Sequence, residues 1–128
     1  MILITHEHFD HLDLNAVEHI KTAATKIVGS PEVAGQIPGI VVMKNGDRQT
    51  VDGLPIEAVP AYNTDKDFHP SASGWVGYVV TVDGVRIYHT GDTDRIREMA
   101  EIKTDVALVP VGGTYTMTVE QAAAAVND

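Results

Sequence analysis

Four residues that commonly bind metal ions stand close together near the start of the chain, at His6, His8, Asp10 and His11 in the segment THEHFDH. The chain has only six histidines, and three of them fall in this segment. It follows MILI, an apolar run typical of a short buried strand. His6 and His8 would point to one side of an extended chain, with Asp10 and His11 projecting from the turn beyond. Imidazoles and carboxylates together suit zinc, manganese or iron, and a bound cation would offset crowding of the imidazoles.

Two later segments carry the same residue types. His69 lies in a polar stretch at residues 63–74, which has the composition and length of a functional loop. The segment IYHTGDTD contains His89 and Asp92, and the intervening Gly91 would allow a sharp turn that presents Asp92 from the end of a strand. Taken alone, a loop histidine is usually solvated and an aspartate after glycine is an ordinary turn residue. Their significance depends on whether the fold brings them to the first cluster.

Composition limits the kinds of function that fit. A chain of 128 residues with 44% hydrophobic residues is expected to form one domain, residues 1–128. Its net charge of −9 disfavours broad contact with nucleic acid. The absence of cysteine excludes disulfides and thiolate metal ligands. No segment is apolar for long enough to predict a membrane span or a signal peptide, so a cytoplasmic location is the default expectation.

The hydrophobic pattern predicts strands that alternate with helices. Strands are expected at residues 1–5, 25–30, 40–43, 54–62 and 105–111, and a hairpin is expected around Asp83 and Gly84. Helices are expected at residues 14–24, after Ser30 and Pro31, at residues 93–102, and after Thr118, where Gln121 completes a capping-box pattern. This order indicates an α/β domain whose sheet carries helices, with function in loops at strand ends.

These motifs resemble those of the metallo-β-lactamase-fold hydrolases. THEHFDH matches the H-x-H-x-D-H signature of that family, and HTGDTD is similar to its downstream aspartate motif. VPVGGTYTM, at residues 109–117, resembles a segment of the small metal-dependent hydrolase branch, which includes the ascorbate-phosphate lactonases. The resemblance covers essentially the whole chain. It implies an αββα sandwich with a dinuclear, zinc-type metal site at one edge of its two sheets, where metal-bound hydroxide hydrolyses a small ester, lactone or phosphoester.

The resemblance also implies a role for each matched residue. His6 and His8 would bind the first ion, Asp10 and His11 the second, and Asp92 would bridge both. Asp10 would also orient the attacking water or relay a proton. His69 is the best candidate for the third histidine of the first ion, with His89 as the alternative. Related sequences often have histidine in the segment that matches PAYN, where this chain has Asn63, and we expect Asn63 to affect metal binding much less than His69.

Other residues near the motifs have plainer expected roles. His19 lies on a predicted helix and is expected at the surface, and His89 is expected to support the site rather than bind metal. Glu7 and Phe9 occupy the variable positions of the motif, so they are expected to be structural and to point away from the metal. The aromatic residues near the motif loops are expected to belong to the core rather than to contact substrate; they are Trp75, Tyr78 and Tyr115.

The ends of the chain depart from the family pattern. The family normally has about two strands before the H-x-H-x-D-H strand and a final histidine beyond the last helix seen here. We therefore expect an incomplete sandwich whose second ion lacks one protein ligand, and exposed edges that could favour a homo-oligomer. The alternative functions are a non-catalytic metal-binding remnant and, less favoured by the charge, a nucleic-acid phosphodiesterase.

Overall fold

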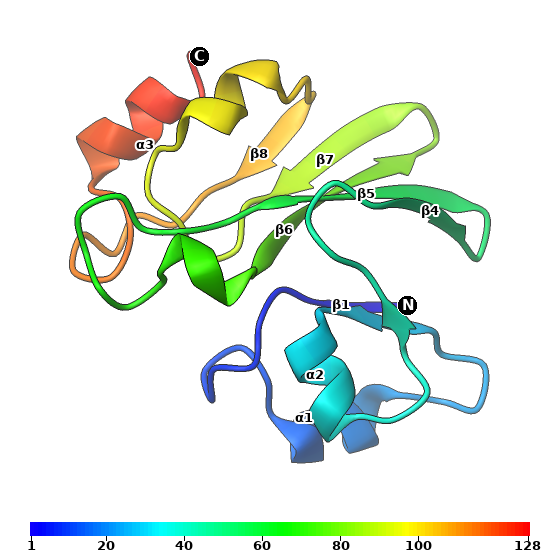
Figure 1. Ribbon diagram of the computed structural model, residues 1–128. Coiled ribbons are helices and arrows are strands. Elements are labelled where there is room, and N and C mark those ends of the chain that lie inside the picture. Colours follow the sequence, from blue (N-terminus) through cyan, green and yellow to red (C-terminus); the bar gives the residue numbers. More distant parts are fainter.

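The computed structural model describes residues 1–128, which form two sheets between outer layers of helices (Figure 1). The smaller sheet is parallel, in the order β1-β2-β3. Its strands alternate along the chain with two short helices that cover its outer face; the elements are β1 (Ile2–Ile4), α1 (Leu14–Ile20), β2 (Ile27–Gly29), α2 (Pro31–Gln36) and β3 (Val41–Val42). Parallel strands need crossover connections, and these two helices provide them.

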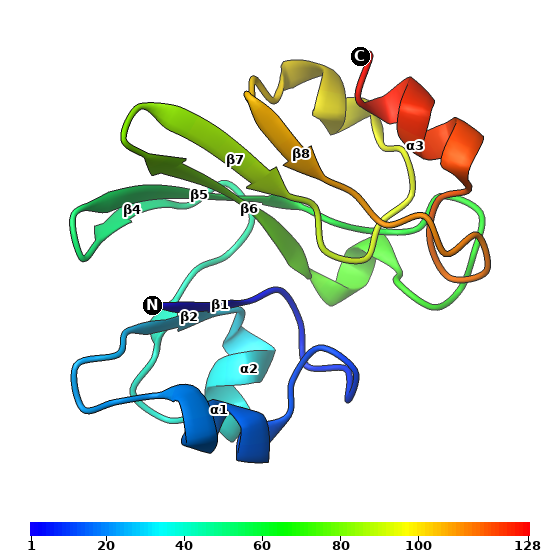
Figure 2. The ribbon, with the colours of Figure 1, turned by 180° about the vertical axis from the view of Figure 1, so that it is seen from behind.

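The larger sheet has five strands in their chain order, β4 (Arg48–Val51), β5 (Leu54–Pro60), β6 (Val76–Val82), β7 (Val85–His89) and β8 (Val106–Leu108). All neighbours are antiparallel except β7 and β8, which are parallel. The view from behind shows this sheet above the smaller one, with α3 (Val119–Ala125) and the 3₁₀ helix η2 (Arg97–Glu101) on its far side (Figure 2). A second 3₁₀ helix, η1 (Ser71–Ser73), lies in the connection from β5 to β6.

Three buried clusters fill the spaces between the four layers. The cluster between the sheets is formed by Val28, Met43, Val51, Ile56, Ala58, Val76 and Tyr78. The cluster beneath α1 and α2 contains Ile4, Leu12, Val17, Ile27 and Val33, and that beneath α3 and η2 contains Val79, Tyr88, Ile96, Met99, Met117, Ala122 and Ala125. Along β6, Tyr78 faces one cluster and Val79 the other, as the alternation of a strand requires. The αββα metallo-β-lactamase-like arrangement expected from the motifs is therefore confirmed.

Local signals located most elements but not all of their ends. The capping box of Thr118 with Gln121, the Ser30 cap with Pro31, and the hairpin at Asp83 and Gly84 are all present. The helix expected at residues 14–24 ends at Ile20, because threonine side chains bond to the backbone at residues 22–25 and favour a turn. The helix expected at residues 93–102 is only the short η2, and β4 was not predicted because RQTV has a single apolar residue.

The strand expected at residues 105–111 is shorter and less buried than predicted. β8 covers only Val106–Leu108, and the side chains of Val106 and Leu108 are exposed because β8 is an edge strand of its sheet. No helix in the structure is both long and apolar enough to cross a membrane.

Candidate metal centre

The end of β1 delivers His6 into the interior of the molecule. Its side chain is 1% exposed, and its Nδ1 atom lies 2.9 Å from the Thr5 hydroxyl oxygen. The other ring nitrogen, Nε2, is buried without any hydrogen-bond partner. Burial, followed by the positive charge of His11, lowers the pKa of His6 to about 3, so the ring is neutral at physiological pH. A buried nitrogen with a free lone pair normally costs stability, and a metal ion would satisfy it.

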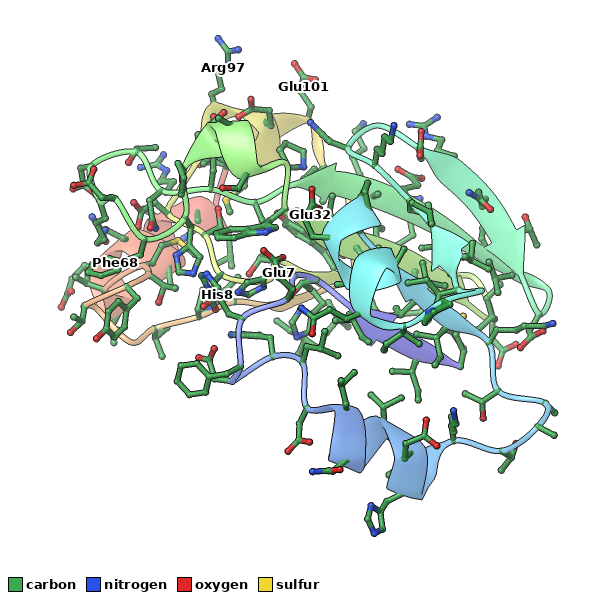
Figure 3. The ribbon with its side chains drawn as sticks, turned by 60° about the horizontal axis from the view of Figure 1, so that its bottom comes forward. Glu7, His8, Glu32, Phe68, Arg97 and Glu101 are labelled. Carbon is green, nitrogen blue, oxygen red and sulfur yellow. The ribbon has the colours of Figure 1, made fainter.

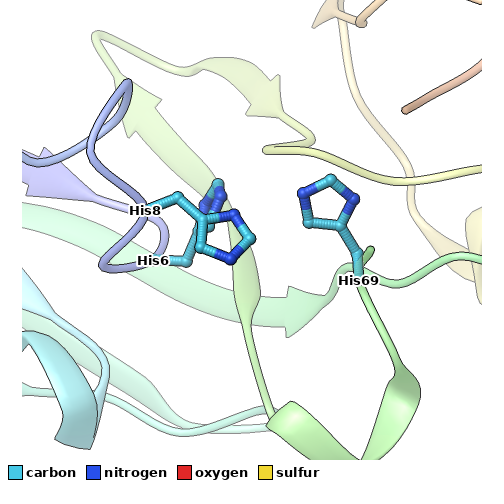
Figure 4. A group of neighbouring side chains, drawn as sticks. All are labelled: His6, His8 and His69. Carbon is cyan, nitrogen blue, oxygen red and sulfur yellow. The ribbon is translucent and has the colours of Figure 1, made fainter. Parts of the chain in front are cut away.

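His69 approaches from the opposite side, on the loop between β5 and β6, so that its ring faces those of His6 and His8 (Figure 4). Asn63 fixes which nitrogen of His69 carries the proton. The Asn63 amide is oriented by two backbone groups, because its Oδ1 accepts the His69 N–H at 2.9 Å and its Nδ2 donates to the Tyr115 carbonyl at 2.9 Å. Oδ1 also lies 3.0 Å from His69 Nδ1, so Nδ1 must be the protonated nitrogen of the neutral ring.

The other nitrogen of His69 then presents a lone pair to a carboxylate. Burial lowers the pKa of His69, which keeps the ring neutral and leaves Nε2 without a proton. His69 Nε2 lies 3.2 Å from Asp92 Oδ2, an atom that can only accept when the carboxylate is ionised. Two acceptors at this distance repel each other, and a cation between them would turn that repulsion into coordination.

Asp92 is positioned by a backbone turn after β7. Gly91 has φ +65°, and a side chain at this position would meet Thr5 at 3.2 Å, so glycine is required for the turn that presents Asp92. Asp92 Oδ2 lies 3.1 Å from His11 Nε2, 3.2 Å from His69 Nε2 and 3.9 Å from His6 Nε2. Ligand atoms that share one tetrahedral zinc ion at about 2.1 Å are about 3.4 Å apart, so these spacings fit a metal ion.

The ligand atoms form two groups that share His6. One contains His6, His8 and His69, and the other contains His6, His11 and Asp92; within each group the atoms lie within 4.8 Å of one another. Asp10 belongs to neither, although its Oδ2 lies 3.6 Å from His11 Nε2 and its side chain is 58% exposed. The structure thus brings five of the six expected ligands into two compact groups, with Asp10 at the margin of the second.

The remaining histidines lie outside both groups. His89 is exposed at the end of β7, and its Nδ1 accepts a hydrogen bond from the Gly91 N–H at 3.2 Å. His19 is exposed on α1 as expected, with Nδ1 2.7 Å from the Asn15 carbonyl oxygen.

In the second group, the pKa of His11 and the pKa of Asp92 are shifted in opposite directions. The hydrogen bond to Asp92 raises the pKa of His11. Burial alone would raise the pKa of Asp92, but the His11 hydrogen bond and the nearby imidazoles lower it below its usual value. Because an ionised carboxylate can only accept, His11 Nε2 donates a hydrogen bond to Asp92 at 3.1 Å, and a bound ion would have to displace that proton.

Two supporting residues were missed by sequence reasoning. Asn63, expected to matter little, is buried against His69 as described above. Asp94 is 2% exposed and anchors the same loop, accepting hydrogen bonds from the Thr64 N–H at 2.9 Å and from Lys66 Nζ at 2.7 Å. Asp94 stands in the HTGDTD motif, so its place beside Asp92 was the only signal for this role.

Trp75 forms a buried wall beside the first group. Its ring centroid lies 5.1 Å from that of His6, 4.5 Å from that of His8 and 5.5 Å from that of His69. The Trp75 indole N–H donates to Glu7 Oε2 at 2.7 Å, which gives Glu7 the structural role expected for it. Trp75 and Tyr78 are buried, as predicted.

The predictions for Tyr115 and Phe9 were wrong. Tyr115 is 54% exposed rather than part of the core, because its loop lies at the surface with its carbonyl held by Asn63. Phe9 is 92% exposed and lines a hollow together with His8 and Asp10, so it neither supports the structure nor points away from the site.

Comparison with known proteins agrees with this geometry. The family model described as the β-lactamase superfamily domain matches residues 1–128. A metal-dependent hydrolase of the UPF0173 group from Thermococcus onnurineus is 40% identical over 99% of this chain, and one from Methanoculleus marisnigri is 37% identical over 95%. The chain spans 61% and 58% of the lengths of these two relatives.

Solved structures show the same fold. The crystal structure of a protein from Parabacteroides distasonis, named as a candidate metal-dependent hydrolase, is 44% identical and superposes with a TM-score of 0.91 over 97% of this chain and 58% of its own. A Thermotoga maritima protein, named as a candidate zinc-dependent hydrolase of the metallo-β-lactamase superfamily, is 26% identical, with a TM-score of 0.55 over 79% of this chain and 51% of its own. This chain belongs to the β-lactamase superfamily domain family.

Proposed function

We propose that the protein is a metal-dependent hydrolase that binds two zinc ions and hydrolyses a small ester, lactone or phosphoester with water. The observation that carries this proposal is the pair of ligand groups around His6, in which a buried His6 nitrogen has no partner and the lone pairs of His69 and Asp92 face each other. The metal-dependent hydrolases among the relatives support it.

The residues present fit two ions of zinc type. His6, His8 and His69 would hold the first ion, while Asp10 and His11 would hold the second with Asp92 shared between them. Nitrogen and oxygen ligands without thiolates suit zinc, and manganese or iron are the alternatives. When bound, such ions lower the pKa of coordinated water towards about 7 and polarise the oxygen of the group under attack.

Asp10 is the residue proposed to orient the attacking water molecule and to accept its proton. Its carboxylate is exposed at the margin of the site and lies 3.6 Å from His11 Nε2, where it can accept a hydrogen bond from an attacking water molecule. Trp75 and the buried face of His6 exclude solvent from the opposite side of the site. The protein's acidic charge and the absence of Lys and Arg from the hollow above the site argue against nucleic acid as the substrate.

Metal binding can be followed through Trp75, which is the only tryptophan in the chain. Chelator-stripped protein is titrated with zinc while its fluorescence and its metal content are measured, and hydrolysis of a panel of small esters, lactones and phosphoesters is then assayed. We expect a fluorescence change, up to two zinc ions per chain, and hydrolysis that a chelator abolishes. His19→Ala is the matched control. Zinc binding without hydrolysis of any substrate would favour the non-catalytic alternative, and no zinc binding would overturn the proposal.

A further inference from the structure

A hollow of about 300 Å³ opens directly above the candidate metal ligands. Its lining has two parts: the ligand residues His8, Asp10, His69 and Asp92, and the aromatic residues Phe9, Phe68 and Tyr115. The aromatic residues come from three separate loops, those that follow β1, β5 and β8. Figure 3 shows Phe68 and His8 on the same side of the molecule, beside the loops that follow β1 and β5.

These aromatic side chains are unusually exposed for their size. Phe9 is 92% exposed, Phe68 52% and Tyr115 54%, and none of them belongs to a buried cluster. Exposed apolar groups gathered at one place commonly mark a site of binding. Because they adjoin the ligand groups, a molecule bound against them would have its reacting atoms close to those ligands.

Phe68 and Tyr115 are held in fixed positions relative to the candidate ligands. Their rings pack edge to face, with centroids 4.6 Å apart. Phe68 directly precedes His69, whose backbone N–H is held by Asn63, and the same Asn63 side chain holds the Tyr115 carbonyl. One buried amide therefore positions a metal ligand and two aromatic residues together, which is the arrangement that a preorganised substrate pocket requires.

The charge of the hollow restricts its ligand further. None of the seven lining residues is Lys or Arg, and two of them are aspartates. The two aspartates are candidate ligands whose charge the bound ions would offset, so the remainder of the hollow has no Lys or Arg to bind a charged substituent that lies away from the scissile bond. The aromatic rings instead favour an apolar group, since they gain by removing it from water.

We propose that the substrate is an uncharged carboxylic ester or lactone with an apolar, preferably aromatic, group beside its scissile carbonyl. This inference rests on the proposed hydrolase function and narrows its substrate class by the group that lies beside the scissile bond. In the reaction, the oxygen of water bonds to the acyl carbon and the bond from that carbon to the ester oxygen breaks. The alcohol leaves with one proton, and the acid product releases the other.

The test compares esters that differ in one group while zinc-loaded protein is assayed by titrating the released proton. The apolar substrates are methyl phenylacetate and benzyl acetate, the small reference is methyl acetate, and monomethyl succinate carries a negative charge. We expect kcat/KM for at least one aromatic ester to exceed that for methyl acetate by about tenfold or more, with monomethyl succinate the poorest substrate. Equal values for all four esters, or a preference for monomethyl succinate, would overturn the inference and leave the hydrolase function standing.

Substitutions of the aromatic residues that line the hollow distinguish contact with substrate from a purely structural role of these residues. Phe68→Ala and Tyr115→Ala should each remove most of the aromatic preference, because each raises KM for the aromatic ester by a larger factor than KM for methyl acetate. Phe68→Leu should restore part of the preference. Ile20→Ala, which truncates an exposed residue on α1, is the matched control and should change neither. An aromatic preference that survives both alanine substitutions would contradict the proposal.

Binding of amides provides a readout that does not depend on catalysis. N-methylphenylacetamide should shift the ring NMR signals of Phe68 and Tyr115 at concentrations where N-methylacetamide does not. If no ester is hydrolysed, the ester form of the proposed function fails, and this titration alone decides whether the hollow takes an apolar group. If no signal shifts, the aromatic residues of the hollow do not form a substrate pocket. The same conclusion follows if the protein is a dimer and Phe68→Ala makes it dissociate.

Discussion

The two ligand groups that share His6 differ in the hydrogen bonds that their ligand atoms make before a metal ion binds. In the group of His6, His8 and His69, the Nδ1 atoms of His6 and His69 lie within hydrogen-bond distance of Thr5 and Asn63, and His6 Nε2 has no hydrogen-bond partner. In the group of His6, His11 and Asp92, His11 already donates to Asp92 at 3.1 Å. The first group is oriented in advance, whereas the second must give up the hydrogen bond from His11 to Asp92 and its proton before it can bind an ion.

This difference predicts an order of binding. Hydrogen bonds to the far side of a ligating imidazole fix its orientation and its tautomer, which reduces the cost of forming the site. Displacing the proton of an imidazole whose pKa is raised adds a cost that depends on pH. We therefore expect the first zinc ion to bind at His6, His8 and His69, and the following predictions are arranged from the largest expected effect to the smallest.

Replacing His6 should have the largest effect because both groups contain it. His6→Ala should reduce affinity for the first zinc ion by about a hundredfold or more, since that ion loses one of its three histidine ligands, and it also removes the ring that packs against His11 of the second group. Metal content after dialysis and the Trp75 fluorescence titration measure this, with His19→Ala as the control. If His6→Ala kept the first ion at full affinity, His6 would not be one of its ligands.

Replacing Asn63 should weaken one group selectively. Asn63→Ala leaves His69 Nδ1 and the His69 N–H without their acceptor, so we expect affinity for the first ion to fall by about 10- to 100-fold while the second changes less. The ¹⁵N shifts of the His69 ring, recorded without metal, should show a mixture of tautomers. Asn45→Ala, at an exposed turn, is the matched control. Unchanged tautomer and affinity would show that Asn63 only supports the loop.

The contrast also explains what sequence could and could not predict. His6, His8 and His11 follow one strand within six residues, so local spacing sufficed to propose a metal site there. The position of Asn63 beside His69 depends on how the loop at residues 63–74 folds back on itself, with the Asn63 N–H bonded to the His69 carbonyl at 2.6 Å. Local sequence patterns do not show how this loop folds back on itself. Because position 63 is Asn rather than His, there was no reason in the sequence to expect a hydrogen bond between its side chain and His69.

Apolar patterns show the same limit. The alternation in β6 and the caps of α2 and α3 are local, and these elements were predicted. Exposure at Phe9, Phe68 and Tyr115 depends on how separate loops meet, whereas residue type alone favoured burial for Tyr115. Departures of this kind depend on contacts between segments that are distant in the sequence, which local preference does not determine.

Acid should destabilise the metal-free protein, and the two groups should contribute with opposite sign. The folded pKa of His6 is about 3, so below pH 6.5 the unfolded chain binds a proton that folded His6 refuses. Stability should fall by about 1.4 kcal/mol per pH unit for each such group, and His69 acts in the same direction. His11, with its raised pKa, instead adds stability that is present below pH 6.5 and is lost as pH rises through its folded pKa.

Denaturant unfolding in the presence of a chelator at pH 7.5, 6.5 and 5.5 measures this balance. We expect the free energy of unfolding to fall towards pH 5.5 in the parent protein and to fall less in His6→Asn, while His19→Asn should behave as the parent. The same slope in His6→Asn as in the parent would show that His6 does not resist protonation in the folded state.

The smallest effect is expected for His89, the alternative third histidine of the first ion. His89 is exposed, belongs to neither ligand group, and accepts a hydrogen bond from the Gly91 N–H at 3.2 Å. Because Gly91 carries the turn that presents Asp92, His89→Ala should change zinc affinity by no more than about threefold, well below the loss expected for His69→Ala. The two variants are compared in one chelator-competition series. If His89→Ala lost as much zinc affinity as His69→Ala, the end of β7 would supply a metal ligand that the loop at residues 63–74 is expected to supply. The first group would then not be oriented in advance by that loop, and the difference between the two groups would not hold.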